Sequence, residues 1–233
     1  MAPPLRAQWT TVHGLRLHAR VRDDLAPHNA PTAVLVHGLS VSSLYFAPTA
    51  RLLAPHCRVY APDLPGYGRS QKPPQVLDVP QLAESLAAWL DAAGIVAPDV
   101  LIANSMGCQT VVELAVRYPH RARRLALDAL FEPLHVTLFL VWPDYLRFGP
   151  RRTLATFRHG QRHHVERQLP LVQAHTLVVR GERDPICPQP WSEQAARLLP
   201  HGELRVVPRA GHAVNANAPA ALARLTLDFL ARA

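Results

Sequence analysis

The sequence predicts an α/β fold in which helices cover both faces of a mostly parallel sheet. Short apolar runs alternate with amphipathic stretches along its 233 residues, as in proteins built from repeated strand and helix units. Apolar residues make up 48% of the chain and charged residues 18%, which is enough for a sizeable core and argues against disorder. No Gly/Ser linker, repeat or low-complexity tract divides the chain, so we expect a single core domain.

Composition also limits the class of protein. The net charge of +8 would suit a nucleic-acid-binding protein, but the positive charge is scattered arginine, with Lys72 as the sole lysine, and no zinc-finger or ribonucleoprotein motif is present. Cys57, Cys108 and Cys187 show no metal or redox spacing, which indicates a reducing compartment. The N-terminus lacks the apolar core of a signal peptide, and the apolar stretch 134–142 is too short to cross a bilayer. We therefore expect a cytoplasmic protein with no nucleic-acid partner and no membrane span.

The strands are predicted from short apolar runs bounded by turn residues. A hairpin comes first, with strands at 8–12 and 15–20 joined by His13 and Gly14. The following runs are nearly continuous in apolar residues, as expected for strands buried on both faces. These strands are expected at 33–37, 58–61, 100–103, 125–127, 176–180 and 203–207.

Helices are predicted between these strands. Residues 78–93 place Leu82, Leu86 and Leu90 on one stripe, and Gly94 follows at the position of a C-terminal cap. A second helix at 106–118 ends before Pro119, which cannot continue it. Further helices are expected at 189–199 and 219–231.

Residues 129–171 break the alternation because they contain no strand pattern. Between positions 121 and 167 there are nine arginines and four acidic residues, so about five of the eight net positive charges fall there. We expect a short helical cap, or lid, inserted at 129–171 into a core domain formed by 1–128 and 172–233. The alternative is a pair of ordinary surface helices.

Ser105 is the candidate nucleophile. It lies where the buried strand 100–103 runs directly into a helix, with the small residues Ala103 and Gly107 two positions on either side. Such a turn holds the serine at the carboxyl end of the sheet and at a helix N-terminus, which favours developing negative charge. The alternative is an ordinary N-cap serine.

His212 is the candidate base for this serine. It follows the last strand in a loop opened by Pro208 and Gly211, at the same edge of the sheet as Ser105. We interpret His37, which precedes Gly38, as a structural residue that orders its loop. Three other histidines fall in the expected lid and are predicted to be solvated: His159, His163 and His164.

A histidine base needs a carboxylate that orients it. Asp184 follows the strand 176–180, lies one strand before the histidine loop, and has its loop fixed by Pro185. Asp128 follows the strand 125–127 at the same edge and is the competing candidate. Glu113 and Glu182 are interpreted as helix or surface residues.

Two further loops complete the expected site. Asp63 opens a turn-rich loop that runs to Ser70, and we interpret an Asp63–Arg69 pair as the contact that holds the loop, with a substrate contact as the alternative. Acyl transfer also needs donors for the oxyanion, and we assign the backbone N–H groups of Leu39 and Met106. The order Ser105, Asp184, His212 matches one convergent form of the catalytic triad.

Four motifs together resemble the α/β-hydrolase fold superfamily over nearly the whole chain. They are His37-Gly38 after a strand, the segment 63–70, the elbow 104–107, and the paired loops at Asp184-Pro185 and Gly211-His212. The resemblance implies an α/β-hydrolase fold with a sheet of about eight strands, a cap after the sixth strand, a serine nucleophile, and neither metal nor organic cofactor.

The chain departs from the superfamily pattern at three points. Ala103 stands where glycine is usual, Cys108 stands where a second glycine is common, and the cap is short. Alanine is small enough for the turn, and we expect Cys108 to be buried against the sheet and inert.

The leading hypothesis is a serine hydrolase that cleaves a carboxylic ester or related acyl bond. Carbon–carbon bond hydrolysis of a ring-cleavage product, acyl transfer, perhydrolysis and non-catalytic ligand binding are the alternatives. Apolar lid residues suggest an apolar small-molecule substrate, and the alternative is that they form the packing face of the lid. The positive charge of the lid, including Arg151 and Arg152, suggests a substrate that carries a carboxylate. The apolar set is Leu134, Val136, Leu138, Phe139, Leu140 and Trp142. Chain length of the substrate and oligomeric state stay open.

Overall fold

The computed structural model describes residues 5–130 and 148–232. One eight-stranded sheet forms its centre, with the spatial order β1-β2-β4-β3-β5-β6-β7-β8. The strands are β1 (Arg6–Val12), β2 (Leu15–Arg22), β3 (Thr32–Val36), β4 (Arg58–Pro62), β5 (Val100–Asn104), β6 (Arg124–Asp128), β7 (His175–Gly181) and β8 (Gly202–Val207). The predicted α/β class and the mostly parallel sheet are therefore confirmed.

Strand direction follows the expected pattern. The hairpin strands β1 and β2 pair antiparallel, β2 pairs antiparallel with β4, and all other pairs are parallel. His13 and Gly14 both take positive φ at the hairpin tip, as a two-residue turn of this twist requires. Because β3 and β5 to β8 run in one direction, their carboxyl ends meet at one edge.

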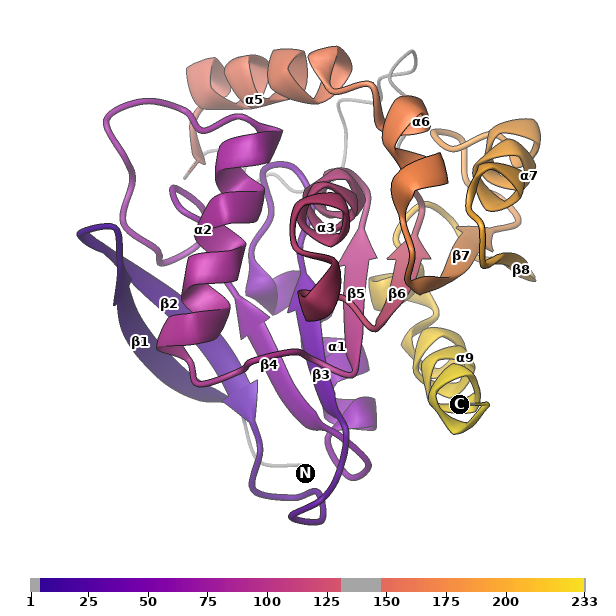
Figure 1. Cartoon of the computed structure of the whole chain (residues 1–233), viewed down its shortest axis with the longest axis horizontal. Coiled ribbons are helices and arrows are strands. Elements are labelled where there is room, and N and C mark those ends of the chain that lie inside the picture. Colours follow the sequence, from indigo (N-terminus) through magenta and orange to yellow (C-terminus); the bar gives the residue numbers. More distant parts are fainter. Residues whose placement is uncertain (1–4, 131–147, 233) are drawn as a thin grey trace.

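Helices cover both faces of this sheet (Figure 1). The face covered by α2 (Val79–Ala92), α3 (Met106–Arg117) and α7 (Gln189–Leu198) holds the larger buried apolar cluster. The opposite face is covered by α1 (Ala47–Leu53) and α9 (Pro219–Ala231), which pack on each other and on a second cluster. The strands between them are buried on both sides, which explains their unbroken apolar runs.

The helix boundaries have identifiable causes. Asp78 caps α2, since its carboxylate accepts the Gln81 N–H while the Gln81 side chain accepts the Asp78 N–H. Gly94 takes a φ of 72° after α2, as predicted for a glycine that ends a helix. The helix α1 was not predicted, nor were the single turns η1 (Ser43–Phe46) and α8 (Val214–Asn217).

The segment predicted as a lid is helical where the structure describes it. It contains α5 (Pro150–Arg162), α6 (Val165–Gln168) and the short turn η3 (Leu169–Leu171). Figure 1 shows α5 lying across the end of the sheet toward which the arrowheads of β5 and β6 point. The six apolar lid residues of the sequence analysis (134, 136, 138, 139, 140 and 142) lie outside the described residues. Within the described ranges, every helix is too short or too polar to cross a membrane.

Candidate active site

Ser105 sits in a strained turn between β5 and α3. Its backbone has a φ of 53° and a ψ of −124°, outside the regions that non-glycine residues normally occupy. The Ser105 N–H donates to the Asp128 carbonyl oxygen (2.9 Å), and the Ser105 carbonyl oxygen accepts the Cys108 N–H (2.9 Å). These bonds hold a half-buried serine at the carboxyl end of β5 and at the N-terminus of α3. A sharp strand-to-helix turn of this kind presents its side chain at the carboxyl edge of the sheet.

The loop after β3 lies directly against this serine. A Cβ on Gly38 would come within 3.2 Å of the Ser105 Cβ and 3.0 Å of the Asn104 carbonyl oxygen, so a larger residue would have to push the serine turn back. His37 fixes the loop, because its Nε2 accepts the Leu64 N–H (3.0 Å) and its Nδ1 donates to the Gly38 carbonyl oxygen (2.9 Å). The backbone N–H of Leu39 bonds to no atom of the described residues, and Met106 is the first residue of α3. Met106 directly follows Ser105, and Leu39 directly follows the Gly38 that approaches it.

His212 and Asp184 meet at the same edge of the sheet. The Nδ1 of His212 lies 3.1 Å and 3.0 Å from the two carboxylate oxygens of Asp184. Burial acts to raise the pKa of Asp184, but the bond from His212 and the N–H groups of Ile186 and Cys187 outweigh it and lower that pKa. An ionised carboxylate accepts the proton of Nδ1, which leaves Nε2 as the basic nitrogen of a neutral ring.

Arg180, which the sequence analysis did not single out, buttresses the Asp184 loop. Its buried guanidinium donates to the carbonyl oxygens of Cys187 (2.7 Å), Glu182 (3.1 Å) and Asp184 (3.2 Å). A lone arginine at the end of a strand gives no sequence signal that it satisfies the backbone of the following loop. The loop is thus held from within by a charged side chain.

Asn104 connects the serine turn to the histidine loop. Its side-chain amide donates to the carbonyl oxygen of His212 (3.3 Å) and to Oδ2 of Asp128 (3.1 Å). Among the described residues, His212 contacts Asp184, Asn104 and Cys187, and no hydrogen bond joins its ring to the Ser105 Oγ. In structures without substrate, the bond between nucleophile and base is often long.

Asp128, the competing candidate, hydrogen-bonds to Asn104 and Asn215 rather than to the ring of His212. Its Oδ2 accepts the Asn215 N–H (3.0 Å) and the Asn104 amide, and the Asn215 side chain in turn donates to Tyr45 in η1. Complete burial raises the pKa of Asp128 to about 7, against the opposing effect of the Asn215 bond. Asp128 therefore ties two loops together through its hydrogen bonds.

The helices α5 and α6 are attached to α3 through a buried glutamate. Glu113 accepts bonds from His163 (2.9 Å) and Gln168 (2.5 Å), and it pairs with Arg117 one turn along α3. Burial acts to raise the pKa of Glu113, but these three partners lower it. The prediction that His163 is solvated was wrong, because its ring is buried against Glu113, fifty residues earlier in the chain.

A second correction concerns Asp63. Its carboxylate accepts the backbone N–H of Arg69 (2.9 Å), so the predicted pair forms through the main chain rather than the guanidinium. The side chain that meets it is His18, whose buried Nδ1 lies 2.8 Å from Oδ2. Burial opposes ionisation, but the bond from His18 and the backbone donors outweigh it and lower the pKa of Asp63 to about 2. Asp63 thus holds its loop from inside the fold.

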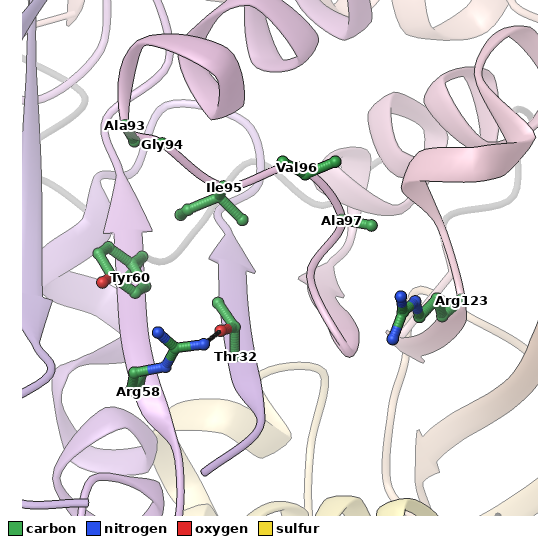
Figure 2. Close-up of a pocket in the computed structure, with 9 residues that line it drawn as sticks. All are labelled: Thr32, Arg58, Tyr60, Ala93, Gly94, Ile95, Val96, Ala97 and Arg123. Carbon is green, nitrogen blue, oxygen red and sulfur yellow. Dashed lines mark hydrogen bonds between the residues drawn. The ribbon is translucent and has the colours of Figure 1, made fainter. Parts of the chain in front are cut away.

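Two pockets in the described residues lie at the opposite end of the strands. Figure 2 shows the first, of about 200 Å³, where Arg58 and Thr32 at the start of β4 and β3 face the loop that follows α2. The second, of about 590 Å³, is lined by Arg124 and Gly202 at the starts of β6 and β8. Neither adjoins Ser105, so neither belongs to the site described above.

The comparisons with known proteins agree with this architecture. A model of the alpha/beta hydrolase family matches residues 33–225. The chain is 28% identical to a 2-hydroxy-6-oxo-2,4-heptadienoate hydrolase from Pseudomonas putida, over 85% of this chain and 88% of that protein. It is 26% identical to a pimeloyl-[acyl-carrier protein] methyl ester esterase from Xanthomonas oryzae pv. oryzae, over 79% and 89%. A solved thermophilic esterase from Thermogutta terrifontis superposes with a TM-score of 0.80 at 21% identity, covering 97% of this chain and 98% of that one, and supports the fold alone.

Proposed function

The chain belongs to the alpha/beta hydrolase family, and from this premise we propose that it is a serine hydrolase that cleaves a carboxylic ester or a related acyl bond. One observation carries the proposal. An ionised Asp184 holds the ring of His212 at the same edge of the sheet where the strained Ser105 turn presents a half-buried hydroxyl. Nucleophile, base and orienting acid within one edge are the parts that acyl transfer through a covalent intermediate requires.

In this mechanism Ser105 attacks the carbonyl carbon of the substrate. The Nε2 of His212 accepts the hydroxyl proton and then delivers it to the departing alcohol, while Asp184 keeps the ring in the required tautomer and stabilises the imidazolium. An acyl group is left on Ser105. Water, deprotonated by His212, then attacks the acyl-enzyme and releases the acid.

The backbone N–H groups of Leu39 and Met106 serve as the oxyanion donors in this proposal. Gly38 brings the first of these amides against Ser105, and the start of α3 supplies the second. Each such donor typically contributes about 3 kcal/mol to transition-state stabilisation.

The inserted segment 129–171 is proposed as a lid over this site. Support comes from its contacts with α3, since Gln109 donates to the Gly160 carbonyl oxygen (3.3 Å) and Glu113 binds His163. On the other side, Arg152 donates to the Pro73 carbonyl oxygen (2.5 Å) and so anchors α5. Its neighbour Arg151 is exposed, so of these two arginines it is the one available to a substrate carboxylate.

The second candidate reaction is hydrolysis of a carbon–carbon bond. It is favoured by the similarity to the P. putida 2-hydroxy-6-oxo-2,4-heptadienoate hydrolase, which extends over most of both chains. The same serine, histidine and aspartate would serve it, so the substrate decides between the two.

The test measures hydrolysis of nitrophenyl esters from acetate to decanoate, with 2-hydroxy-6-oxo-2,4-heptadienoate alongside. We expect the wild type to turn over the esters and Ser105→Ala to lose at least about 1,000-fold in kcat/KM. Ser192→Ala, which removes a buried hydroxyl on α7 that bonds to the Pro188 carbonyl oxygen, is the matched control and should keep its rate. Ester turnover that survives in Ser105→Ala would overturn the serine mechanism, and turnover of the dienoate alone would select the second candidate.

A further inference from the structure

We infer that Asp184, Cys187 and His212 together form a binding site for a zinc-like divalent cation, and that such a cation switches the enzyme off. The binding stands on the geometry of these three side chains. The inhibition rests in addition on the proposed function, in which His212 is the base.

The three side chains converge on one point. Each offers one ligand atom, and the three atoms all lie within 4.8 Å of one another. The Nδ1 of His212 is 3.0 Å from Oδ2 of Asp184 and 3.9 Å from Sγ of Cys187. Around a tetrahedral zinc ion, two such atoms would be separated by about 3.3 Å for nitrogen and oxygen and about 3.6 Å for nitrogen and sulfur. The two observed distances are within about 0.3 Å of the tetrahedral values, and the Cys187 thiol must move about 1 Å closer to the carboxylate of Asp184 to complete the ligand set.

The local backbone places the thiol there. Oδ1 of Asp184 accepts the N–H groups of Ile186 (2.8 Å) and Cys187 (3.1 Å), which folds the loop back on the carboxylate. The guanidinium of Arg180 also donates to the Cys187 carbonyl oxygen. The backbone of Cys187 is therefore held in a hydrogen-bonded turn, so the loop loses little conformational freedom when a cation binds.

The chemistry of the set suits zinc. Thiolate, imidazole and carboxylate are the usual zinc ligands, and three protein ligands leave the fourth position for water. Cys187 and Asp184 are buried, where an isolated charge is costly. One thiolate and one carboxylate neutralise the two positive charges of the ion, so the occupied site carries no net charge.

Occupation of this site removes the base. A neutral imidazole carries one proton, and in the free enzyme that proton lies on Nδ1, facing Asp184. When a cation takes Nδ1, the ring proton must lie on Nε2, which then has no lone pair to accept the Ser105 proton. The Cys187 thiol releases its proton to solvent, so one proton leaves for each cation bound. No bond to substrate and no change of oxidation state is involved.

The experiment starts from protein freed of metal with EDTA and then dialysed. Zinc chloride binding is measured by calorimetry. Cobalt chloride binding is measured by the thiolate-to-cobalt charge-transfer absorption. The rate of nitrophenyl ester hydrolysis is measured before and after the addition of one equivalent of zinc. We expect one cation per chain, a thiolate band, and a loss of activity of at least about 10-fold that EDTA reverses.

Two cysteine variants separate this site from adventitious binding by the other histidines. The Cys187→Ala variant should show no cobalt band and should bind zinc at least about 10-fold more weakly than the wild type. Zinc should leave the ester hydrolysis rate of this variant at its metal-free value. Cys57→Ala removes another fully buried thiol, on the far cluster of the core, and should behave as the wild type. If Cys187→Ala does not fold, Cys187→Ser takes its place.

The outcomes for the site and for the proposed function are distinct. A wild type without the cobalt band, or a Cys187→Ala protein that keeps it, overturns the cation site whatever the ester activity. A wild type that shows the Cys187-dependent band but turns over no ester supports the site and counts against the proposed function. Ester turnover that zinc leaves unchanged while the band is present overturns the inhibitory role.

Discussion

Asp128 and Asp184 follow neighbouring strands of one sheet and are both buried beside His212, yet their surroundings differ in kind. Asp184 faces the ring nitrogen of His212 and two backbone N–H groups, and its pKa is lowered. Asp128 faces one backbone N–H and one amide, is completely buried, and its pKa is raised to about 7. Position at the carboxyl edge of a parallel sheet therefore does not make a carboxylate an orienting acid. What differs between the two aspartates is the number and charge of the hydrogen-bond donors around each carboxylate, and these set its pKa.

The largest expected effect is the difference in activity between the Asp184→Asn and Asp128→Asn variants. Asp184→Asn removes the negative charge that holds the Nδ1 proton of His212, and kcat should fall about 10,000-fold. Asp128→Asn keeps an oxygen that accepts the Asn104 and Asn215 bonds, so its loss should stay under about 10-fold. Steady-state ester hydrolysis at pH 8 measures both. Equal losses would make Asp128 a second orienting acid and end the distinction.

Asp63 is a third buried carboxylate, and it lies outside the candidate active site. Its substitution therefore shows how much an ionised buried aspartate contributes to the stability of the fold. Asp63→Asn leaves His18 without its charged partner and should lower the free energy of unfolding by about 3 kcal/mol. Urea unfolding near pH 7 measures it, with the exposed Asp228→Asn on α9 as the control. If the free energy of unfolding is unchanged, the His18–Asp63 contact is not a stabilising pair.

The smallest effect concerns the pH dependence of stability. The folded pKa of Asp128, about 7, exceeds its unfolded value near 4, so its contribution is fully present below pH 4 and is lost as the pH rises through 7. Asp184, with a lowered pKa, contributes in the opposite sense, above pH 4. The stability of Asp128→Asn relative to the wild type should therefore rise by about 2 to 3 kcal/mol between pH 5 and pH 8. Chemical unfolding at the two pH values measures this, and an unchanged difference would show that Asp128 titrates normally.

The sequence was sufficient for the features that depend on neighbouring residues. The apolar runs predicted every strand of the sheet to within a few residues, and the capping and stop signals predicted α2 and α3. The short helix α1 was missed because Pro48 and a length of seven residues give it little periodicity. The Asp184–His212 contact was expected from strand order, because both loops follow adjacent strands.

Side chains whose partners are distant in the sequence were not predictable in the same way. The burial of His163 depends on Glu113 and that of His18 on Asp63, and one histidine among thirteen carries no mark of its partner. Cys187 showed no metal spacing to another cysteine, yet the fold brings it beside His212, 25 positions later. Such pairs are set by packing between elements, which local patterns do not encode.

The backbone contact between the loops that follow β7 and β8 fixes Asp184 and His212 relative to each other. A Cβ on Gly181 would lie 2.2 Å from the Gly211 carbonyl oxygen, so the backbones that lead to Asp184 and His212 are in direct contact. The two loops consequently behave as a single rigid part whose geometry is complete once the chain has folded. In the proposed mechanism, substrate binding energy is therefore not needed to bring Asp184 and His212 together and is available for the attack on the acyl carbon. Evolution of new specificities in this chain can then alter the inserted helices without disturbing the proton-transfer geometry.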